Sequence, residues 1–311
     1  MLVGGQGTRL RPLTDSTPKQ MLPIVDVPMV ERVLAHLARS GVTDAVLSLG
    51  YKPDVFLAAY PDGRCGGVGI TYAVEPEPLD TAGGIAFAAR SAGITDTFVA
   101  VNGDVLTHFR VCDLIEFHRA RGASASIHLT PVDDPSAFGV VPTDDYGRVL
   151  AFVEKPPPGQ APTNLINAGT YVLEPSVLDL VGANARVSME REVFPALVEA
   201  QSLYAMASDD YWIDTGTPAK YLQANLDLLE SAGGVAGSAV IEGNVVPPSF
   251  VGAGARVGRG ARVDGSVVGR GAAVGEDAWV TQSLVLAGAV VAGGAVVKRS
   301  IVCADGAVVN A

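Results

Sequence analysis

Cysteine is scarce in this sequence: Cys65, Cys112 and Cys303 are the only three, and no two of them stand in a CxxC pair. This usage argues against a disulfide scaffold or a zinc ribbon and favours a reducing compartment. The first residues also lack the basic segment and apolar segment of a secretory signal peptide. The least polar stretch, residues 284–297, is too short and too rich in glycine for a membrane span. We therefore expect a soluble, cytoplasmic protein with no membrane partner.

Positive charge is also in short supply, because 22 lysines and arginines stand against 33 acidic residues, for a net charge of −11 at pH 7. Such a surface repels phosphate over most of its area, which argues against a nucleic-acid partner. Any anionic ligand must therefore be bound by a local cluster of positive groups. Only five lysines occur in 311 residues, so a lysine in a rigid context is informative.

The C-terminal part of the chain, from about residue 235, is a repeat. Its valines recur in steps of 6, 6 and 5 residues, at Val251, Val257, Val263, Val268, Val274, Val280, Val285, Val291, Val297, Val302 and Val308. Three short strands per coil, each with one aliphatic side chain inside and a turn on a small residue, form a parallel β-helix. A flexible Gly/Ala linker would show no such phase. Val240 and Val246 continue the spacing backwards, so we expect the β-helix to begin near residue 238.

The first 230 residues alternate between two patterns. Apolar, β-rich runs occur at 45–50, 97–105 and 124–132, and amphipathic helical stretches occur at 29–41, 111–122 and 219–231. This alternation predicts an α/β fold with a mainly parallel sheet, whose ligands bind at the carboxyl ends of the strands. A Gly/Ala joint at 231–240 separates it from the repeat. We predict two domains, 1–232 and 233–311.

The chain opens with MLVGGQGTRL, in which Gly4, Gly5 and Gly7 permit a close backbone approach that side chains would block. Successive exposed N–H groups in such a loop form an anion-binding concavity. The loop does not match the Walker pattern GxxxxGK[ST], and an ordinary strand-to-helix turn is the alternative. Arg9 and Lys19 favour phosphate binding, because both can point at one triphosphate.

Two aspartates, Asp104 in VAVNGDVL and Asp214 in YWIDTGTP, each end an apolar run. Carboxylates from two strand ends can hold one Mg²⁺ ion against substrate phosphates. For either aspartate alone, a helix N-cap or a turn is the alternative.

In FVEKPP, Lys155 can neutralise a monophosphate while Glu154 accepts hydrogen bonds from hydroxyls. An exposed ion pair on an edge strand is the alternative for these two.

Seven segments, in this order, resemble the sugar-1-phosphate nucleotidyltransferases: GGQGTRLRPLTDSTPKQMLPI, NGDV, FGVV, VEKP, INAGTYVL, MEREVFPAL and WIDTGTP. The resemblance covers residues 1–230 and implies a Rossmann-like, mixed and mainly parallel nucleotidyltransferase domain, followed by a left-handed parallel β-helix of hexapeptide repeats. MEREVFPAL, YAM, WIDTGTP and the repeat are most similar to mannose-1-phosphate guanylyltransferases, which implies GTP and mannose-1-phosphate as substrates. PKQMLP is also similar to glucose-1-phosphate thymidylyltransferases, so the nucleotide stays open.

The resemblance also implies roles for individual residues. Arg9, Lys19 and Asp104 would be catalytic, with Lys19 bridging the α-phosphate and the sugar phosphate. Asp104 and Asp214 would hold Mg²⁺. The nucleotide would be bound by Gly4, Gly5, Gly7, Thr8, Arg9, Asp80 and Thr81, and the sugar phosphate by Gly139, Glu154, Lys155 and Asn167.

The implied reaction is the in-line attack of a sugar-1-phosphate oxygen on the α-phosphorus, with pyrophosphate leaving. The attacking oxygen is already an anion, so positioning and charge neutralisation supply the rate and no general base is needed.

Two departures from the family stand out. Members usually carry a few more residues before the glycines, so we expect the first strand to be shortened here. Asp80 stands where related sequences commonly have glycine, which puts the identity of the base in doubt.

Three other functions fit parts of the sequence. Hexapeptide-repeat acyltransferases generally rely on a histidine base, yet the four histidines, His36, His108, His118 and His128, all precede the repeat. A non-catalytic regulatory paralogue should have lost the arginine, the lysine or a metal aspartate, and its best support is Asp80. The third is the same reaction on glucose-1-phosphate or a sugar-like phosphate with dTTP, UTP or ATP. We expect the β-helix to serve oligomerisation or regulation, in a homo-oligomer.

Overall fold

The computed structural model describes all 311 residues, which divide into two compact units. The first unit comprises Met1–Gln6 and Val30–Trp212, and the second comprises Gly7–Met29 and Ile213–Ala311. The segment Gly7–Met29 is therefore grouped with the C-terminal part of the chain, although it directly follows the first six residues. The predicted domain boundary between residues 232 and 233 stays a prediction.

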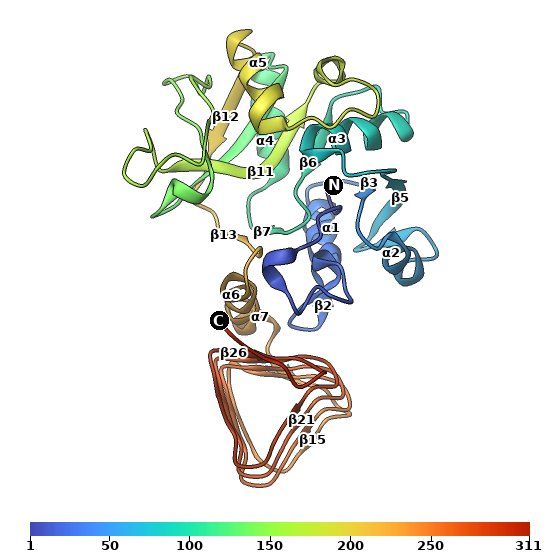
Figure 1. The fold of residues 1–311 in the computed structure, drawn as a ribbon, viewed down its shortest axis with the longest axis vertical. Helices are drawn as coiled ribbons and strands as arrows, with labels where there is room; N and C mark the ends of the chain where they lie inside the picture. Colours follow the sequence, from blue (N-terminus) through green and yellow to red (C-terminus); the bar gives the residue numbers. More distant parts are fainter. The chain divides into compact units, whose positions relative to one another are not determined.

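Most strands of the first unit lie in two sheets (Figure 1). Its strands are β3 (Asp44–Leu49), β4 (Arg64–Cys65), β5 (Val68–Val74), β6 (Phe98–Val101), β7 (Val105–Thr107), β8 (Ala125–Pro131), β9 (Gly139–Val140), β10 (Val153–Glu154), β11 (Leu165–Leu173) and β12 (Leu203–Ala207). One sheet has the order β3-β5-β4, and the other has the order β10-β9-β11-β8-β12, with β6 also paired to β11. Strand β11 runs antiparallel to β6, β8 and β9, whereas β12 is parallel to β8 and β3 to β5. The α/β fold with a mixed sheet is confirmed, whereas the prediction of a mainly parallel sheet is wrong, because β11 pairs antiparallel with three strands.

The helices of the first unit are α1 (Met29–Arg39, whose first residue belongs to the second unit), α2 (Pro53–Ala59), α3 (Asp80–Ser91), α4 (Val111–Arg121), the π-helical turn Met189–Val193 and α5 (Phe194–Glu199). Helix α4 ends where Gly122 adopts φ 58° and its N–H donates to the carbonyl of Arg119 at 3.2 Å. This left-handed residue costs a glycine little and terminates the helix. Helices α1 and α4 agree with the predicted stretches 29–41 and 111–122.

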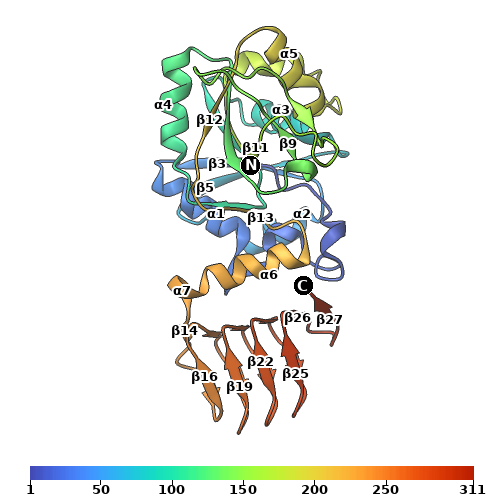
Figure 2. The same ribbon diagram turned by 90° about the vertical axis from the view of Figure 1, so that its left-hand side faces the viewer.

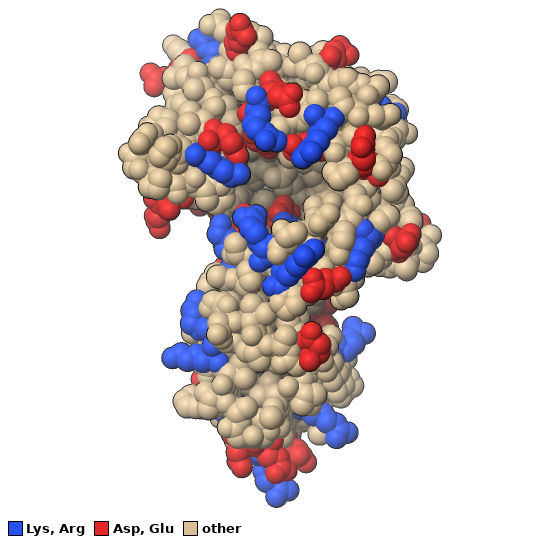
Figure 3. All heavy atoms as spheres, viewed as in Figure 1, with Lys and Arg blue, Asp and Glu red and all other residues tan.

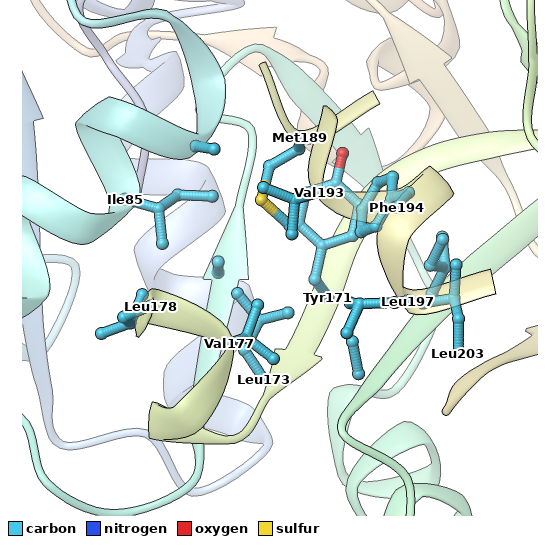
Figure 4. Close-up of a cluster of buried hydrophobic side chains, with 14 of the residues drawn as sticks. Ile85, Tyr171, Leu173, Val177, Leu178, Met189, Val193, Phe194, Leu197 and Leu203 are labelled. Carbon is cyan, nitrogen blue, oxygen red and sulfur yellow. The ribbon is translucent and has the colours of Figure 1, made fainter. Parts of the chain in front are cut away.

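A cluster of buried side chains joins α3, β11 and α5 (Figure 4). Tyr171 and Phe194 form its aromatic centre, with ring centroids 5.3 Å apart and an interplanar angle of 65°. This edge-to-face arrangement adds to the stabilisation from apolar burial. Met189 and Val193 lie beside the two rings, so the π-helical turn is held by the same cluster.

The second unit combines the segment Gly7–Met29, β13 from Ile213 on, helices α6 (Pro218–Asp227) and α7 (Leu229–Ala232), and the repeat. Strands β1 (Pro23–Ile24) and β2 (Val27–Pro28) form a short antiparallel pair. The Tyr221 hydroxyl of α6 donates to the carbonyl of Pro23, and the Asn225 side chain accepts from the N–H of Val25 at 2.6 Å. These buried bonds tie α6 to the early segment, across about 200 residues of sequence.

The repeat forms the parallel coils of a left-handed β-helix with a triangular cross-section (Figures 1 and 2). Its strands are β14 (Gly234–Val235), β15 (Val240–Ile241), β16 (Asn244–Val246), β17 (Phe250–Val251), β18 (Arg256–Val257), β19 (Arg262–Asp264), β20 (Val267–Val268), β21 (Ala273–Val274), β22 (Trp279–Thr281), β23 (Leu284–Val285), β24 (Val290–Val291), β25 (Val296–Lys298), β26 (Ser300–Val302) and β27 (Val308–Asn310). Strand β14 already pairs with β17, so the coils begin at Gly234, slightly before the predicted residue 238. Val308 lies outside the parallel coils, because β27 turns back antiparallel to β26.

A column of serines also runs along the β-helix, and the valine spacing did not point to it. Ser249, Ser266, Ser283 and Ser300 recur every 17 residues, which is the length of one coil. Each backbone N–H from Ser266 on donates to the hydroxyl of the serine one coil earlier, at 3.0–3.2 Å. These bonds satisfy buried polar groups at the same corner of successive coils.

Truncation of Phe194 tests the cluster around Tyr171. We expect Phe194→Ala to lower the free energy of unfolding by about 3–5 kcal/mol, because a fully buried ring is lost and a cavity remains. Urea denaturation followed by circular dichroism measures this change. Tyr146→Ala is the matched control, since Tyr146 is 68% exposed. Equal losses in the two variants would contradict the assignment of Phe194 to the core.

The buried histidine His128 gives the fold a pH dependence. Its ring stacks on Phe109 with centroids 3.6 Å apart, Nε2 is 2.9 Å from the Ser208 hydroxyl, and Nδ1 has no partner. Burial lowers the pKa of His128 to about 4, although the charge of Asp210 opposes this shift. The imidazole is therefore neutral in the folded protein at pH 7, in a structural position.

Because the pKa of His128 is lower in the folded than in the unfolded protein, its contribution to stability is complete above pH 6.5. It is lost as the pH falls towards 4. The loss amounts to about 3 kcal/mol for a shift of this size. We expect His128→Gln to remove this part of the pH dependence of urea unfolding between pH 4 and 6.5. Identical slopes in the variant and the parent protein would show that the imidazole does not titrate as described.

Candidate functional site

In the first unit, the hydroxyl of Tyr171 interacts with several predicted site residues, one by a hydrogen bond and others through their charge. This hydroxyl accepts a hydrogen bond from the side chain of Asn167 at 2.9 Å. Burial raises the pKa of Tyr171, and the negative charges of Glu190, Asp104 and Glu154 raise it further. Of the predicted site residues, Asn167 thus contacts this hydroxyl and Asp104 and Glu154 act on it through their charge, as does Glu190, which the sequence analysis missed. The acidic residues of MEREVFPAL were the available signal.

The backbone of β11 is irregular between Asn167 and Tyr171. Its register with β8 shifts there, and Gly169 adopts φ 78°. The N–H of Gly169 donates to Oδ1 of Asn167 at 3.0 Å, and a side chain at Gly169 would place its first carbon 2.7 Å from Nδ2 of Asn102. Irregularities of this kind redirect side chains and are common next to active sites. The glycine of INAGTY is therefore required by both conformation and space.

Strands β9 and β10 bring together Gly139, Glu154 and Lys155, which the sequence assigns to the sugar phosphate. Gly139 pairs with Glu154, and a side chain at Gly139 would lie 2.6 Å from the ring of Phe152. Lys155 adopts φ 47°, and its N–H donates to the carbonyl of Phe138 at 3.0 Å. A left-handed lysine persists only where its surroundings hold it.

The Lys155 ammonium lies 3.1 Å from Glu154, on a side chain that is 65% exposed. An ion pair so open to solvent contributes little to stability. The geometry of Glu154 and Lys155 is therefore compatible with both interpretations of the sequence, an exposed ion pair on an edge strand and a phosphate-binding pair.

Asp80 begins α3 in the left-handed conformation, with φ 63°, which favours glycine. One carboxylate oxygen lies 2.7 Å from the Arg191 guanidinium, and the other accepts from the N–H of Thr81 at 2.8 Å. The Thr81 hydroxyl donates to Glu190 at 2.8 Å and accepts from the N–H of Met189 at 2.8 Å. These bonds fasten the start of α3 to the π-helical turn and hold Glu190 in place.

In the second unit, Gly7 adopts φ 63° at the start of the short 3₁₀-helix Thr8–Leu10. Its carbonyl accepts from the Thr14 hydroxyl at 2.8 Å, and a side chain at Gly7 would lie 3.4 Å from Cβ of Lys19. Lys19 is only 8% exposed and begins a second 3₁₀-helix directly after Pro18. The predicted lysine is therefore packed against the glycine loop.

Arg9 and Asp214 of the second unit border one glycine, Gly216. A side chain there would place its first carbon 2.8 Å from a guanidinium nitrogen of Arg9 and 2.9 Å from Oδ1 of Asp214. The same Oδ1 accepts from the N–H of Gly216 at 2.9 Å. The glycine of WIDTGTP thus leaves room for two predicted site residues.

The two first glycines differ in their surroundings. A side chain at Gly4 would lie 3.1 Å from the backbone nitrogen of Gly50, so close packing requires a glycine there. Gly5 is exposed and has open space around it. Gly4 is therefore constrained by packing, whereas the space beside Gly5 is open to a ligand.

No group of three or more histidine, cysteine or acidic side chains forms a metal cage. Mg²⁺ usually takes one or two carboxylates and fills its other positions with water and substrate phosphates. Asp104 and Asp214 are oxygen donors that suit this hard cation, so the donor chemistry fits.

One face of the molecule carries lysine and arginine side chains interspersed with acidic ones (Figure 3). Among the helices, none has both the length and the hydrophobicity needed to span a bilayer.

The model of the nucleotidyl transferase family matches residues 1–231. The chain belongs to this family. The resemblance predicted from the sequence is confirmed, and this nucleotidyl transferase is an enzyme of a family that generally uses a divalent metal ion.

Among its relatives, the mannose-1-phosphate guanylyltransferase of Mycobacterium tuberculosis is 43% identical over 246 residues, which are 78% of this chain and 67% of that protein. The mannose-1-phosphate guanyltransferase of Pichia angusta is 44% identical over 71% of this chain and 61% of its own length. The mannose-1-phosphate guanylyltransferase 1 of Arabidopsis thaliana is 42% identical over 71% and 62%. This nucleotidyl transferase therefore spans about three fifths to two thirds of these relatives.

Solved structures agree on the fold. HddC from Yersinia pseudotuberculosis superposes with a TM-score of 0.63 at 29% identity, over 73% of this chain and 97% of that chain. A putative glucose-1-phosphate thymidylyltransferase from Bacillus anthracis superposes with a TM-score of 0.65 at 24% identity, over 72% and 92%. The second likeness shows the fold alone.

Substitution of Asp80 tests whether the left-handed backbone conformation determines which residues this position of the nucleotidyl transferase tolerates. We expect Asp80→Gly to change the unfolding free energy by less than about 1 kcal/mol, because relief of the left-handed conformation offsets the lost ion pair. Asp80→Val loses the same ion pair and places a branched side chain at φ 63°, which costs about 1–3 kcal/mol. Urea denaturation of both variants measures the difference. If the valine variant proved as stable as the glycine variant, the backbone argument would be wrong.

Proposed function

We propose that this enzyme joins mannose-1-phosphate to GTP, giving GDP-mannose and pyrophosphate. The observation that carries the proposal is the similarity to eight proteins named mannose-1-phosphate guanylyltransferases or guanyltransferases, at 40–44% identity over 71–79% of this chain. A structure of HddC complexed with GMP-PN, 28% identical, supports a guanine nucleotide.

In the proposed reaction, an oxygen of the sugar phosphate attacks the α-phosphorus of GTP. A new P–O bond forms as the bond to the bridging oxygen breaks, and pyrophosphate leaves with that electron pair. Both reactants are anions, so they must be held together against their repulsion and the charge at the α-phosphate must be neutralised. We assign these tasks to Arg9 and Lys19. The low exposure of Lys19 supports this role, since a desolvated ammonium interacts more strongly with phosphate.

Mg²⁺ is the metal ion we propose, with Asp104 and Asp214 as its protein ligands. When bound, it would neutralise phosphate charge and orient the reacting groups. For the nucleotide we propose Gly4, Gly5, Gly7, Thr8, Arg9, Asp80 and Thr81. For the sugar phosphate we propose Gly139, Glu154, Lys155 and Asn167. The pairing of Gly139 with Glu154, the ion pair of Glu154 with Lys155 and the bond from Asn167 to Tyr171 support this assignment.

The histidines need no chemical role in this mechanism, because no proton has to be removed from the attacking phosphate. The β-helix holds no histidine, which argues against acyl transfer. We propose that it contributes to a homo-oligomer. The three free cysteines suit a reducing compartment, and we propose the cytoplasm.

Pyrophosphate release with Mg²⁺ tests the substrate pair, across GTP, dTTP, UTP and ATP against mannose- and glucose-1-phosphate. We expect the maximum at GTP with mannose-1-phosphate. A maximum elsewhere would contradict the substrates and keep the mechanism. Nucleotide binding without turnover in any combination would favour a regulatory protein instead.

Two variants test the assigned residues in the same assay. We expect Lys19→Gln and Asp104→Asn to lower kcat/KM by about 10²–10³-fold, because each removes charge from the reacting phosphates or their metal. Asp179→Asn is the control, since Asp179 is exposed in the turn Pro175–Leu180. Unchanged melting temperatures would separate lost chemistry from lost folding. Full activity in either variant would remove that residue from the mechanism.

A further inference from the structure

The π-helical turn Met189–Val193 joins the start of α3 to the core of the first unit. Turns of this kind are rare and are frequently found at functional sites. Met189 and Val193 are buried in the cluster that contains Tyr171, whereas Glu190 and Arg191 bond to residues at the start of α3 (Figure 4). The turn therefore has α3 on one side and a residue of β11 on the other.

The residues just before this turn cap α3. Leu79 precedes the helix without a side-chain cap, and the N–H groups of Ala82 and Gly83 donate to the carbonyl of Val187 at 2.9 and 3.1 Å. The first N–H groups of a helix have no partner within it, so these bonds satisfy them from outside. A side chain at Gly83 would collide with the carbonyl oxygen of Ala185, so the glycine permits this close approach.

The carboxylate of Glu190 holds the start of α3 to the turn. Its Oε2 accepts from the hydroxyls of Thr81 and Ser188, both at 2.8 Å. The Thr81 hydroxyl in turn accepts from the N–H of Met189 at 2.8 Å. Hydrogen bonds to a charged group are stronger than those between neutral groups. One oxygen of Glu190 thus fixes two hydroxyls that lie far apart in the sequence.

The charge of Glu190 also acts on the hydroxyl of Tyr171. Burial raises the pKa of this hydroxyl, and the negative charge of Glu190 raises it further. The hydroxyl therefore keeps its proton at neutral pH, and it accepts from the Asn167 side chain at 2.9 Å. Oδ1 of Asn167 accepts from the N–H of Gly169 at 3.0 Å. These bonds fix the orientation of the Asn167 amide.

We propose that Glu190 is a positioning residue, which keeps the start of α3 and the pair Tyr171–Asn167 in one fixed relation. Under the proposed function, on which this role rests, Thr81 belongs to the nucleotide site and Asn167 to the sugar-phosphate site. Two reactants held in the correct geometry react far faster than the same reactants bound loosely. Glu190 is assigned no contact with either substrate, and it acts through Thr81 and Tyr171.

Two substitutions of Glu190 test this role by steady-state kinetics. We expect Glu190→Ala to lower kcat by about 10–10²-fold and to change the KM of each substrate by less than about threefold, because both substrates still bind but are no longer aligned. Glu190→Gln keeps an acceptor oxygen for the two hydroxyls, so we expect its kcat to stay within about threefold of the parent value. Glu199→Gln is the control, since Glu199 is exposed at the end of α5. Full kcat in Glu190→Ala, a change in KM alone, or equal losses in the two Glu190 variants would overturn the role.

Amide hydrogen exchange in the absence of substrates tests the role separately from the reaction. We expect Glu190→Ala to speed exchange by at least about tenfold at Ala82, whose N–H caps α3, and at Gly169, whose N–H bonds to Asn167. Phe117 in α4 is the reference for global unfolding, and we expect its exchange to be unchanged.

Faster exchange at only one of the two groups, or at neither, would overturn the proposal that Glu190 links the two sites. Equal acceleration at Phe117 would overturn it as well, because Glu190 would then stabilise the whole unit. A parent protein that releases no pyrophosphate with any pair of substrates would contradict the proposed function, and the exchange rates would still report whether Glu190 links α3 to Asn167.

Discussion

The backbone hydrogen bonds of β11 are the interaction on which the first unit most depends. This strand, Leu165–Leu173, pairs with β6, β8 and β9, and it carries Tyr171 into the aromatic centre of the core. The irregular stretch after Asn167 belongs to the sheet and also to the proposed sugar-phosphate site. The bond from Asn167 to the Tyr171 hydroxyl joins the two roles. Core packing therefore sets where Asn167 lies.

Charge imposes the second constraint. A protein with net charge −11 can bind phosphates only where its few positive groups lie close together and the nearby carboxylates have partners within the protein. In the first unit, the carboxylate of Glu190 accepts from two hydroxyls, those of Thr81 and Ser188, and Asp80 is paired with Arg191. The ion pair with Arg191 offsets the charge of Asp80, whereas the hydroxyl donors orient Glu190 without removing its charge.

The sequence predicted the structure of its C-terminal repeat more completely than that of its α/β part. The β-helix followed from spacing alone, because each coil makes the same contacts and a 17-residue period repeats them. In the α/β part, periodicity predicted the helices α1 and α4 and the strands β3 and β8. It gave no sign that Gly7–Met29 packs with the C-terminal part, since the bond from Val25 to Asn225 joins residues far apart in sequence.

In the candidate site too, the sequence predicted some features and the tertiary structure decided others. Glycines, lysines and aspartates at strand ends indicated phosphate and metal chemistry from the sequence alone, because only a few residue types perform it. That Glu190 accepts hydrogen bonds from Thr81 and Ser188, and that Asp80 adopts a left-handed backbone, were decided by tertiary structure. Local patterns determine which elements form and which chemistry is available, whereas packing between distant segments determines which side chains meet.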